Sequence, residues 1–455
     1  MANYFFIGIG GSGMSAIAQI LAGRGHGVSG SDRSNDSGVN GPFFGKLREL
    51  GIRLFPQDGS GVTADCDCVV VSTAIEDTVP DMASARRLGV PVKHRAQALA
   101  ELFNSERGVA AGGTSGKSTV CGMAGVLLAE AGLDPSIING GRMKNFGDGL
   151  LPGNARAGRS DLMVIESDES DGSIVNYQPA VSIITNVTKD HKTIPELIGL
   201  FETFISNTRE LAVINADCPI ASKLKTDGRK TVYYALDAEA DIRPADVELF
   251  PFSSTFALGG EKYVLNVPGR HNVSNALAAI AVGRHLGIPE PELRRGIGAF
   301  AGIARRFDLI GEAGGVRVID DFGHNPDKIR ATIEALGNLP GRRLLVFQPH
   351  GFGPTKFMRD ELIEVFAAKL RPEDRLYMPE IFYAGGSAER SVSSAEIIDA
   401  VVSRGRQAFF FETRSGIGDA LVADAQAGDA IVVMGARDDT LTEFCRSVLS
   451  GLKSK

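Results

Sequence analysis

Residues 108–119 read GVAAGGTSGKST, a short apolar run followed by a glycine-rich loop that ends in a lysine and two hydroxyl residues. The apolar run predicts a buried strand, and the residues that follow, to about 131, predict a helix. Glycines let backbone N–H groups turn toward phosphate oxygens, and the first turn of a helix adds partial positive charge. The order strand, loop, helix therefore predicts a site for nucleotide phosphates. Its binding residues are expected to be Gly113, Thr114, Ser115, Gly116, Lys117, Ser118 and Thr119.

This loop differs in one position from the general pattern G-x-x-x-x-G-K-[ST], because Ala111 stands where the first glycine is expected. In that pattern the lysine contacts the β- and γ-phosphates and the next hydroxyl binds Mg²⁺. Lys117 and Ser118 hold those two positions here. A glycine-rich turn with a solvated lysine is the alternative interpretation, but the order of the predicted elements favours a nucleotide site.

An acidic stretch follows another buried run. Residues 162–165 (LMVI) predict a strand that leads directly into residues 166–171 (ESDESD). Hard cations prefer carboxylate oxygens, and sites in α/β proteins form at the carboxyl ends of strands. Glu166 is therefore the predicted metal-binding acid, with an acidic surface loop as the alternative. His191 follows the strand predicted at 182–185 in an equivalent place and is a further candidate.

The N-terminus carries a second glycine-rich turn. Residues 8–13 (GIGGSG) lie between a predicted strand and a predicted helix, and Asp32 ends the following strand. This pattern is typical of dinucleotide binding and favours NAD when taken alone. The same geometry suits the diphosphate of a UDP-sugar, and a purely structural turn is a third interpretation.

Two polar clusters also point to a nucleotide. Asn272 and Asn275 begin a predicted helix, where asparagine amides either read an adenine edge or simply cap the helix. Residues 305–307 (RRF) lie at a predicted domain boundary. They are either a solvated basic pair or a hinge that brings an arginine to a transferred phosphate when domains close.

Apolar runs alternate with helical patterns along most of the 455 residues, which predicts an α/β fold with parallel sheets. The length favours about three domains. We predict a Rossmann-like domain at 1–105, a central phosphate-loop domain at 106–302 and a Rossmann-like domain at 303–455. A small β excursion is expected between Thr231 and Val267.

The composition excludes several classes of function. A net charge of -7 argues against a broad nucleic-acid surface. The five cysteines are scattered and lack metal-site spacing apart from the pair Cys66 and Cys68, which we interpret as two reduced thiols, so their usage fits a reducing compartment. The first residues lack a basic region and a cleavage site, and no apolar run is long enough to span a bilayer. We therefore expect a cytoplasmic protein that does not insert into membranes.

Taken together, the motifs resemble the Mur ligase family over nearly the whole chain. The matching residues share one order along the sequence and comprise 8–15, 113–118, 166–171, 190–191, 271–275, 305–307 and 320–326. The resemblance implies three domains, which bind a UDP-sugar, ATP and an amino acid in that order. It also implies that the carboxylate of UDP-N-acetylmuramate attacks ATP to give an acyl phosphate, which the amine of an amino acid then converts to an amide.

The family pattern implies a role for individual residues. The implied ligands of Mg²⁺ are Ser118, Glu166 and His191. The implied catalytic residues are Lys117, Glu166, His191 and Arg306. Adenine and ribose would contact Asn272, Asn275 and Asp320. The UDP-sugar would contact Gly10, Gly11, Ser12, Gly13, Met14, Ser15, Asp32, Ser72, Thr73 and Arg95. The amino-acid substrate would contact His324 and His350.

The C-terminal third departs from the pattern of family members that accept L-alanine. Those enzymes carry two adjacent histidines where this chain has His324 and Asn325. They carry Arg-Tyr-Thr-Arg after the histidine that corresponds to His350, whereas residues 351–356 here read GFGPTK. The positive charge of Lys356 could replace part of what is lost. L-Alanine is the first expected acceptor, and a recycled tripeptide or another acceptor is the alternative.

Two other classes of function compete with the ligase. An NAD(P)-binding oxidoreductase would use residues 8–13 and Asp32 but leaves the second phosphate loop unexplained. A non-catalytic nucleotide-binding regulator would keep the phosphate loop and would not need Glu166, His191 and Arg306. The oligomeric state is expected to be a monomer or a homodimer.

Overall fold

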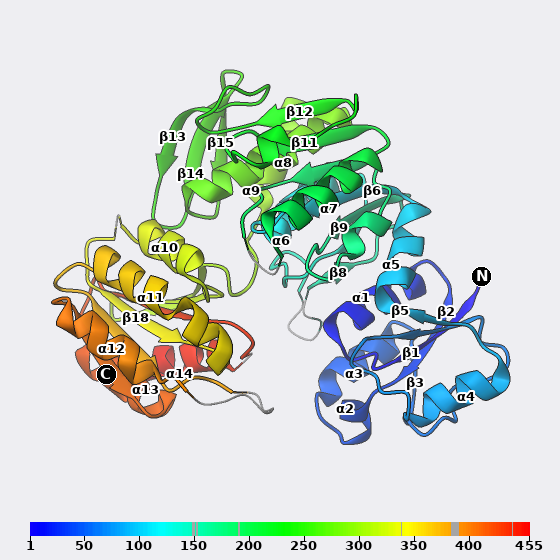
Figure 1. Cartoon of the computed structure of the whole chain (residues 1–455), viewed down its shortest axis with the longest axis horizontal. Coiled ribbons are helices and arrows are strands. Elements are labelled where there is room, and N and C mark those ends of the chain that lie inside the picture. The colour runs from blue at the N-terminus through cyan, green and yellow to red at the C-terminus, as the bar shows by residue number, and fades with distance from the viewer. Residues whose placement is uncertain (148–150, 152, 190–191, 338, 384–390, 439) are drawn as a thin grey trace. The chain divides into compact units, whose positions relative to one another are not determined.

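The computed structural model describes residues 1–147, 151, 153–189, 192–337, 339–383, 391–438 and 440–455. It is an α/β fold with three mainly parallel sheets, which confirms the predicted fold class (Figure 1). The chain forms two compact units. The first comprises Met1–Glu248 with Ser254–Ile303, and the second comprises Leu249–Ser253 with Ala304–Lys455.

The N-terminal sheet has five parallel strands in the order β3-β2-β1-β4-β5. Both of its faces are covered, since side chains of α1, α3 and α5 pack on one face and those of α4 on the other. The buried strands consequently read as continuous apolar runs. The elements are β1 (Asn3–Ile7), α1 (Ser12–Gly23), β2 (Gly27–Ser31), α2 (Arg33–Asp36), α3 (Gly41–Glu49), β3 (Arg53–Phe55), β4 (Cys68–Val71), α4 (Pro80–Leu88), β5 (Val92–His94) and α5 (Arg95–Asn104).

The central sheet has seven strands in the order β12-β11-β10-β6-β9-β7-β8, all parallel except the edge pair β7–β8. Its strands are β6 (Arg107–Gly112), β7 (Ser136–Ile138), β8 (Ala155–Arg156), β9 (Leu162–Glu166), β10 (Val181–Ile184), β11 (Leu211–Asn215) and β12 (Thr231–Tyr234). Strand β6 lies between β9 and β10, with Ala111 opposite Glu166 and Gly112 opposite Ile184. The carboxyl ends of these three strands therefore meet at one edge.

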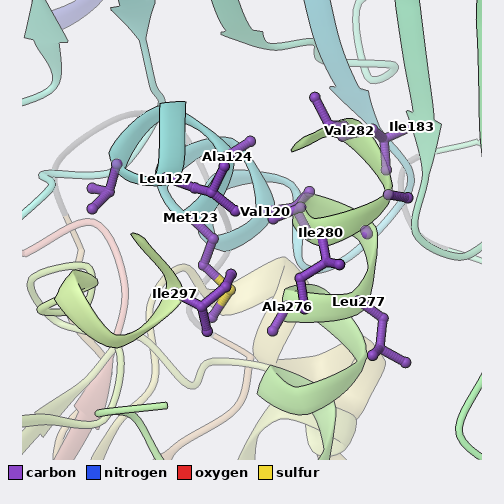
Figure 2. Close-up of a cluster of buried hydrophobic side chains, with 14 of the residues drawn as sticks. Val120, Met123, Ala124, Leu127, Ile183, Ala276, Leu277, Ile280, Val282 and Ile297 are labelled. Atoms are coloured by element: carbon purple, nitrogen blue, oxygen red, sulfur yellow. The ribbon is translucent and has the colours of Figure 1, made fainter. Parts of the chain in front are cut away.

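Helix α6 is buried along almost its whole length and holds the phosphate loop in place. Val120, Met123, Ala124 and Leu127 pack against α8 and α9 (Figure 2). A Cβ on Gly296 would lie 2.8 Å from the Cα of Leu127, so glycine permits this close approach. The helices of the central part are α6 (Lys117–Glu130), α7 (Ile194–Ser206), α8 (Arg270–His285), α9 (Glu290–Ala299), η1 (Ser173–Asn176) and η2 (Ala221–Lys223).

The predicted β excursion is only partly correct. Strand β12 lies inside the predicted range but pairs with β11 in the central sheet. A separate three-stranded sheet follows, and it consists of β13 (Ala245–Leu249), β14 (Ser254–Leu258) and β15 (Glu261–Leu265). Strands β7 and β8 were not predicted, because two- and three-residue edge strands carry almost no periodic signal.

The C-terminal sheet has the order β16-β17-β21-β18-β19-β20 and is parallel except for the edge pair β16–β17. Side chains of α10, α11 and α12 cover one face, and those of α13 and α14 cover the other. The elements are β16 (Asp308–Ala313), β17 (Val316–Asp321), α10 (Pro326–Ala335), β18 (Arg343–Gln348), α11 (Phe352–Lys369), β19 (Arg375–Pro379), α12 (Ser394–Ser403), β20 (Gln407–Phe411), α13 (Arg414–Asp424), β21 (Ala430–Gly435) and α14 (Leu441–Ser454).

Candidate active site

The phosphate loop connects β6 to α6 and depends on its glycines. Gly113 has φ 124° and Gly116 has φ 88°, both in the region that disfavours side chains. A Cβ on Gly113 would lie 2.1 Å from Thr185 Oγ1. The loop therefore takes the tight course that the sequence predicted, with Lys117 opening α6.

Side chains that follow β10 brace this loop. Asn186 Oδ1 accepts hydrogen bonds from Thr114 Oγ1 at 2.7 Å and from the backbone N–H of Ser115 at 2.9 Å. The backbone N–H of Thr188 donates to Thr114 Oγ1 at 3.0 Å. Sequence reasoning assigned no role to Asn186. Its position after a strand adjacent to the loop strand was the available signal.

Lys117 is held by two acceptors. Its ammonium donates to the carbonyl of Gly113 at 2.8 Å and to Glu169 Oε2 at 2.9 Å. The two side chains are only 13% and 4% exposed. Burial raises the pKa of Glu169, and the nearby Lys117 charge opposes that rise. Glu169 was not among the predicted site residues, although it belongs to the acidic stretch that the sequence singled out.

Glu166 and Ser118, two of the three predicted metal ligands, lie beside consecutive glycines. The backbone N–H of Gly140 donates to Glu166 Oε2 at 2.8 Å. A Cβ on Gly141 would lie 3.4 Å from the Cβ of Ser118. Carboxylate and hydroxyl oxygens suit Mg²⁺, so this pair fits the predicted ion.

The third predicted metal ligand, His191, lies outside the described residues. Within the residues that the structure describes, no three histidine, cysteine, aspartate or glutamate side chains form a metal-binding group. The candidate Mg²⁺ site therefore consists of Glu166, Ser118 and a position for His191 that stays a prediction.

The two predicted adenine contacts lie next to the phosphate loop. A Cβ on Gly116 would lie 3.0 Å from Asn275 Oδ1. Asn275 donates to Asn272 Oδ1 at 3.2 Å, and Asn272 donates to the carbonyl of Pro268 at 2.7 Å. Gly269 is the N-cap of α8. Neither asparagine therefore caps the helix, and the simple capping interpretation is wrong.

The N-terminal glycine turn is closed by Asp32. Its Oδ2 accepts from the backbone N–H of Gly10 at 2.8 Å, and its Oδ1 accepts from that of Ser34 at 2.9 Å. Both oxygens of this carboxylate are thus engaged within the domain. A free acid that binds a ribose hydroxyl, as the NAD interpretation requires, is not favoured by this arrangement.

The first turn of α1 has a cation beside it. A Cβ on Gly13 would lie 2.7 Å from Nη1 of Arg95, so this guanidinium contacts the helix start. Asn154 of the central part donates to the carbonyl of Ser12 at 2.8 Å. Ser72 and Thr73 directly follow β4, with Ser72 half-buried and Thr73 exposed. A helix N-terminus with an adjacent arginine favours an anionic ligand.

In the second unit, Arg306 lies between two residues with unusual backbones. Arg305 has φ 61° and Phe307 has φ 48°, which is rare for side chains of this size. Arg305 donates to the carbonyl of Gly435 at 2.9 Å, and the backbone N–H of Phe307 donates to Asp321 Oδ2 at 2.7 Å. Arg306 is therefore held between two anchored neighbours.

Asp320 does not occupy the surface position expected of a ribose contact. Its side chain is fully buried, accepts from Thr442 Oγ1 at 2.6 Å and pairs with Arg305 at 3.6 Å. The carboxylate thus anchors Arg305 inside the second unit, which disfavours the ribose role. Burial raises the pKa of Asp320.

The two predicted histidines of the second unit lie side by side, with ring centroids 5.7 Å apart. His324 Nδ1 lies 2.9 Å from the carbonyl of Phe322. Because a carbonyl only accepts, Nδ1 carries the proton and Nε2 keeps its lone pair. Burial lowers the pKa of His324 to about 4 and also lowers that of His350. Both rings are therefore neutral at pH 7.

Three family domains match this chain in the same order as its sheets. The Mur ligase family catalytic domain matches residues 3–107, the Mur ligase middle domain matches 112–283, and the Mur ligase glutamate ligase domain matches 305–437. The chain belongs to the Mur ligase family. It is accordingly an ATP-dependent ligase, which removes the oxidoreductase and the regulator as competing interpretations.

The Mur ligases that resemble this chain match it over nearly its whole length. The UDP-N-acetylmuramate–L-alanine ligase of Agrobacterium fabrum is 36% identical over 99% of the chain and 96% of the relative. The enzyme of the same name from Pelotomaculum thermopropionicum is 37% identical over 95% of the chain and 94% of the relative.

Solved Mur ligase structures agree with this fold. The UDP-N-acetylmuramate-alanine ligase MurC of Thermotoga maritima has a TM-score of 0.79 and 25% identity, with full coverage of both chains. A murein peptide ligase from Psychrobacter arcticus has a TM-score of 0.64 at 23% identity, covering 100% of this chain and 99% of its own. Within the described part of this Mur ligase, no helix is long and apolar enough to cross a membrane.

Proposed function

We propose that this Mur ligase joins an amino acid, with L-alanine as the first candidate, to the lactyl carboxylate of UDP-N-acetylmuramate. One observation carries the proposal: Lys117, Ser118 and Glu166 converge at one edge of the central sheet. Support for the substrates comes from relatives that carry this ligase name and match 95% or more of the chain. The reaction would contribute to the synthesis of peptidoglycan precursors in the cytoplasm.

The proposed reaction has two steps. A carboxylate oxygen of the sugar attacks the γ-phosphorus of ATP, and ADP leaves. The amine then attacks the acyl carbon, loses a proton and expels phosphate to form the amide. Two anions must approach each other in the first step, so cations are the main requirement. Lys117 supplies one positive charge, and we assign Arg306 the second.

Glu166 and Ser118 would hold Mg²⁺, with His191 as the third proposed ligand. The ion neutralises charge on the phosphate oxygens when it is bound. Glu166 is oriented for such a role because the backbone of Gly140 fixes one of its oxygens. Asn272 and Asn275 are the proposed adenine contacts, since both lie beside the loop at Gly116.

The UDP-sugar is proposed to bind at the N-terminal glycine turn. Residues 10–15 begin α1, and Arg95 places a guanidinium at that helix start. Asp32, Ser72 and Thr73 lie at the carboxyl ends of β2 and β4, at the same edge of the sheet. We propose the functional domains 1–105, 106–302 and 303–455, with the sugar in the first.

His324 and His350 are proposed to contact the acceptor, because neutral imidazoles can receive a hydrogen bond from an amine.

A peptide acceptor is the second candidate. Residues 351–354 at the start of α11 carry no cation to bind an α-carboxylate, and Phe352 instead packs with Ile381 and Val392. A peptide acceptor is also supported by a solved structure of UDP-N-acetylmuramate:L-alanyl-gamma-D-glutamyl-meso-diaminopimelate ligase from Neisseria meningitides. It is 26% identical to this chain, with a TM-score of 0.57 and coverage of 67% of this chain and 100% of its own.

An isotope experiment tests the acyl phosphate. UDP-N-acetylmuramate labelled with ¹⁸O in its lactyl carboxylate is incubated with ATP, Mg²⁺ and L-alanine, and released phosphate is analysed by mass. We expect one labelled oxygen in each phosphate, because a carboxylate oxygen leaves with phosphorus. Unlabelled phosphate accompanying an amide product would exclude this route. Replacing L-alanine with the tripeptide in a parallel reaction separates the two acceptor candidates.

A further inference from the structure

The pair Lys117–Glu169 is not accounted for by the proposed reaction. Lys117 alone suffices to contact phosphates, and Glu169 is neither a metal ligand nor a substrate contact in that scheme. Yet the structure places a buried carboxylate 2.9 Å from the ammonium that the reaction depends on. A negative charge beside a lysine that binds anionic phosphates would by itself weaken phosphate binding, so the carboxylate needs another explanation.

Burial decides whether this pair can separate. The Glu169 side chain is 4% exposed, so breaking the pair would leave an unpaired charge in the protein interior. That change is strongly unfavourable for buried ion pairs. The pair is therefore expected to persist when a nucleotide binds, with Lys117 lying between the carboxylate and the phosphates.

The donors of Lys117 permit such a bridging position. An ammonium has three N–H donors. One of them points to the carbonyl of Gly113 and another to Glu169 Oε2, at 2.8 and 2.9 Å. The remaining donor is fixed in direction by these two contacts. A long flexible side chain thus becomes a rigid group, with its rotamer entropy already lost before the substrate arrives.

We propose that Glu169 is a positioning residue, which holds the Lys117 ammonium so that its third N–H points at the phosphoryl group being transferred. The inference rests on the proposed function only in taking ATP as the ligand of the loop. It separates two properties of the site. Orientation of Lys117 depends on Glu169, whereas the negative charge of Glu169 works against nucleotide binding.

This separation gives a kinetic signature for the variant Glu169→Gln. Removing the carboxylate charge leaves nucleotide affinity unchanged or higher, because a neighbouring anion is gone. Loss of the ion pair lets Lys117 move, and misplacement of a catalytic group by about 1 Å can cost a factor of the order of 100 in rate. We expect kcat to fall by about tenfold or more, while Kd for ATP does not rise.

The experiment uses the full chain. Kd is measured by calorimetry with Mg²⁺ and a non-hydrolysable ATP analogue, and kcat is measured by phosphate release with saturating substrates. Asp168→Asn is the matched control, because it also removes a negative charge from this acidic stretch, but Asp168 is exposed and accepts a hydrogen bond from the backbone N–H of Ser170. Glu169→Asp keeps the charge and is expected to retain more activity than Glu169→Gln. Circular dichroism and the thermal midpoint establish that each variant folds.

Two results would overturn the proposal: an unchanged kcat in Glu169→Gln, or a Kd that rises as much as kcat falls. Failure of the wild-type protein to bind the ATP analogue would instead contradict the proposed function, so the two failures are distinguishable.

Discussion

Gly140 lies so close to Glu166 that any side chain there would displace the carboxylate. A Cβ on Gly140 would be 2.6 Å from Glu166 Oε2, and the backbone of Gly140 is not in the left-handed region. The glycine is thus needed for space and not for conformation. A sequence motif does not identify such a residue, because its role depends on a backbone N–H and on the space left by the missing side chain.

The variant Gly140→Ala tests the metal assignment at this position. We expect the Mg²⁺ concentration for half-maximal activity to rise about tenfold, as for other residues that orient a metal ligand. Gly199→Ala is the control, since Gly199 is exposed on α7 with open space around it. An unchanged Mg²⁺ requirement in Gly140→Ala, with activity retained, would contradict the proposal that Gly140 orients Glu166 toward the ion.

His324 gives a pH-dependent prediction. Burial lowers the pKa of His324 to about 4 from the ordinary 6.5. Between pH 4 and pH 6.5 the His324 ring is therefore protonated in the unfolded chain and neutral in the folded chain. Stability consequently rises with pH across this window and is lost as pH falls from 6.5 toward 4, by at most about 3 kcal/mol from this group. A titration of the seven histidines by NMR, assigned with His324→Gln, should show one ring with a midpoint near 4. A midpoint for His324 near 6.5 would contradict the buried placement.

Among the elements, the parallel strands of the central sheet explain why the site forms where it does. Because β6 lies between β9 and β10, the residues that follow these strands meet at one edge. The sequence predicted Glu166 there from its place after an apolar run. It did not predict that Asn186 would brace the loop or that Glu169 would pair with Lys117, 52 positions away. Such contacts depend on strand order, which periodicity does not reveal.

The limits of the sequence prediction are similar in the second unit. The apolar strands β17, β18 and β21 were predictable, because buried parallel strands form continuous apolar runs. The antiparallel edge strand β16 was not predictable, because buried and exposed residues do not alternate regularly along it. It is a strand only because it pairs with β17, which follows it in the chain. Asp320 was assigned to ribose by family resemblance, whereas its burial against Arg305 and Thr442 is a tertiary property.

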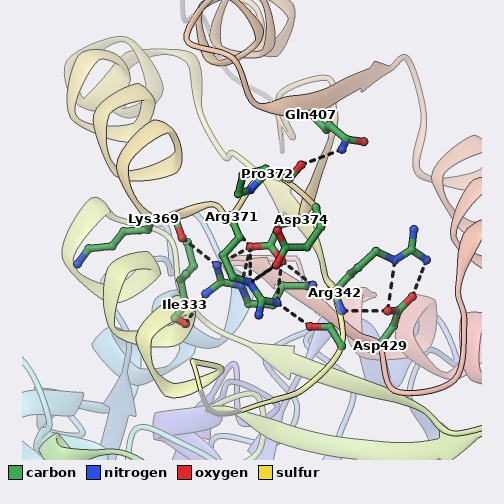
Figure 3. A network of polar contacts seen from close by, with 11 residues as sticks. Ile333, Arg342, Lys369, Arg371, Pro372, Asp374, Gln407 and Asp429 are labelled. Carbon is green, nitrogen blue, oxygen red and sulfur yellow. Dashed lines mark hydrogen bonds and ion pairs between the residues drawn. The ribbon is translucent and has the colours of Figure 1, made fainter.

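An ion-pair network lies at the amino ends of β18 and β19 in the C-terminal sheet (Figure 3). This is the end of the strands away from His324 and His350, which follow the carboxyl ends of β17 and β18. Asp374 is fully buried and accepts from Arg343 and Arg371, and these contacts lower its pKa although burial opposes them. Asp374→Ala would leave Arg343 buried without its carboxylate. We expect a loss of about 3–5 kcal/mol in the stability of this unit.

Thermal unfolding followed by circular dichroism checks this expectation. Asp360→Ala is the comparison, because the Asp360 side chain is 84% exposed in its pair with Arg359 and should matter little. Equal unfolding temperatures for the two variants would show that the buried network does not stabilise the sheet.

At the scale of the whole molecule, the assigned groups are divided between the two compact units. Lys117, Ser118 and Glu166 belong to the first, and Arg306, His324 and His350 belong to the second. Within the first unit, the N-terminal and central sheets share one hydrophobic core, because side chains of α1, α5 and α7 belong to the same cluster. The proposed reaction thus assigns a role to residues of each unit.

The most direct test of the central claim is the mass of the product. The protein is incubated with UDP-N-acetylmuramate, L-alanine, ATP and Mg²⁺, and the mixture is analysed by mass spectrometry beside reactions that lack one component and a reaction with Lys117→Ala. We predict a conjugate heavier than the UDP-sugar by one alanine residue, formed with ADP only in the complete mixture and lost in the folded Lys117→Ala protein. Absence of a conjugate with L-alanine, with any other amino acid and with the tripeptide, or a conjugate formed without ATP, would contradict the account.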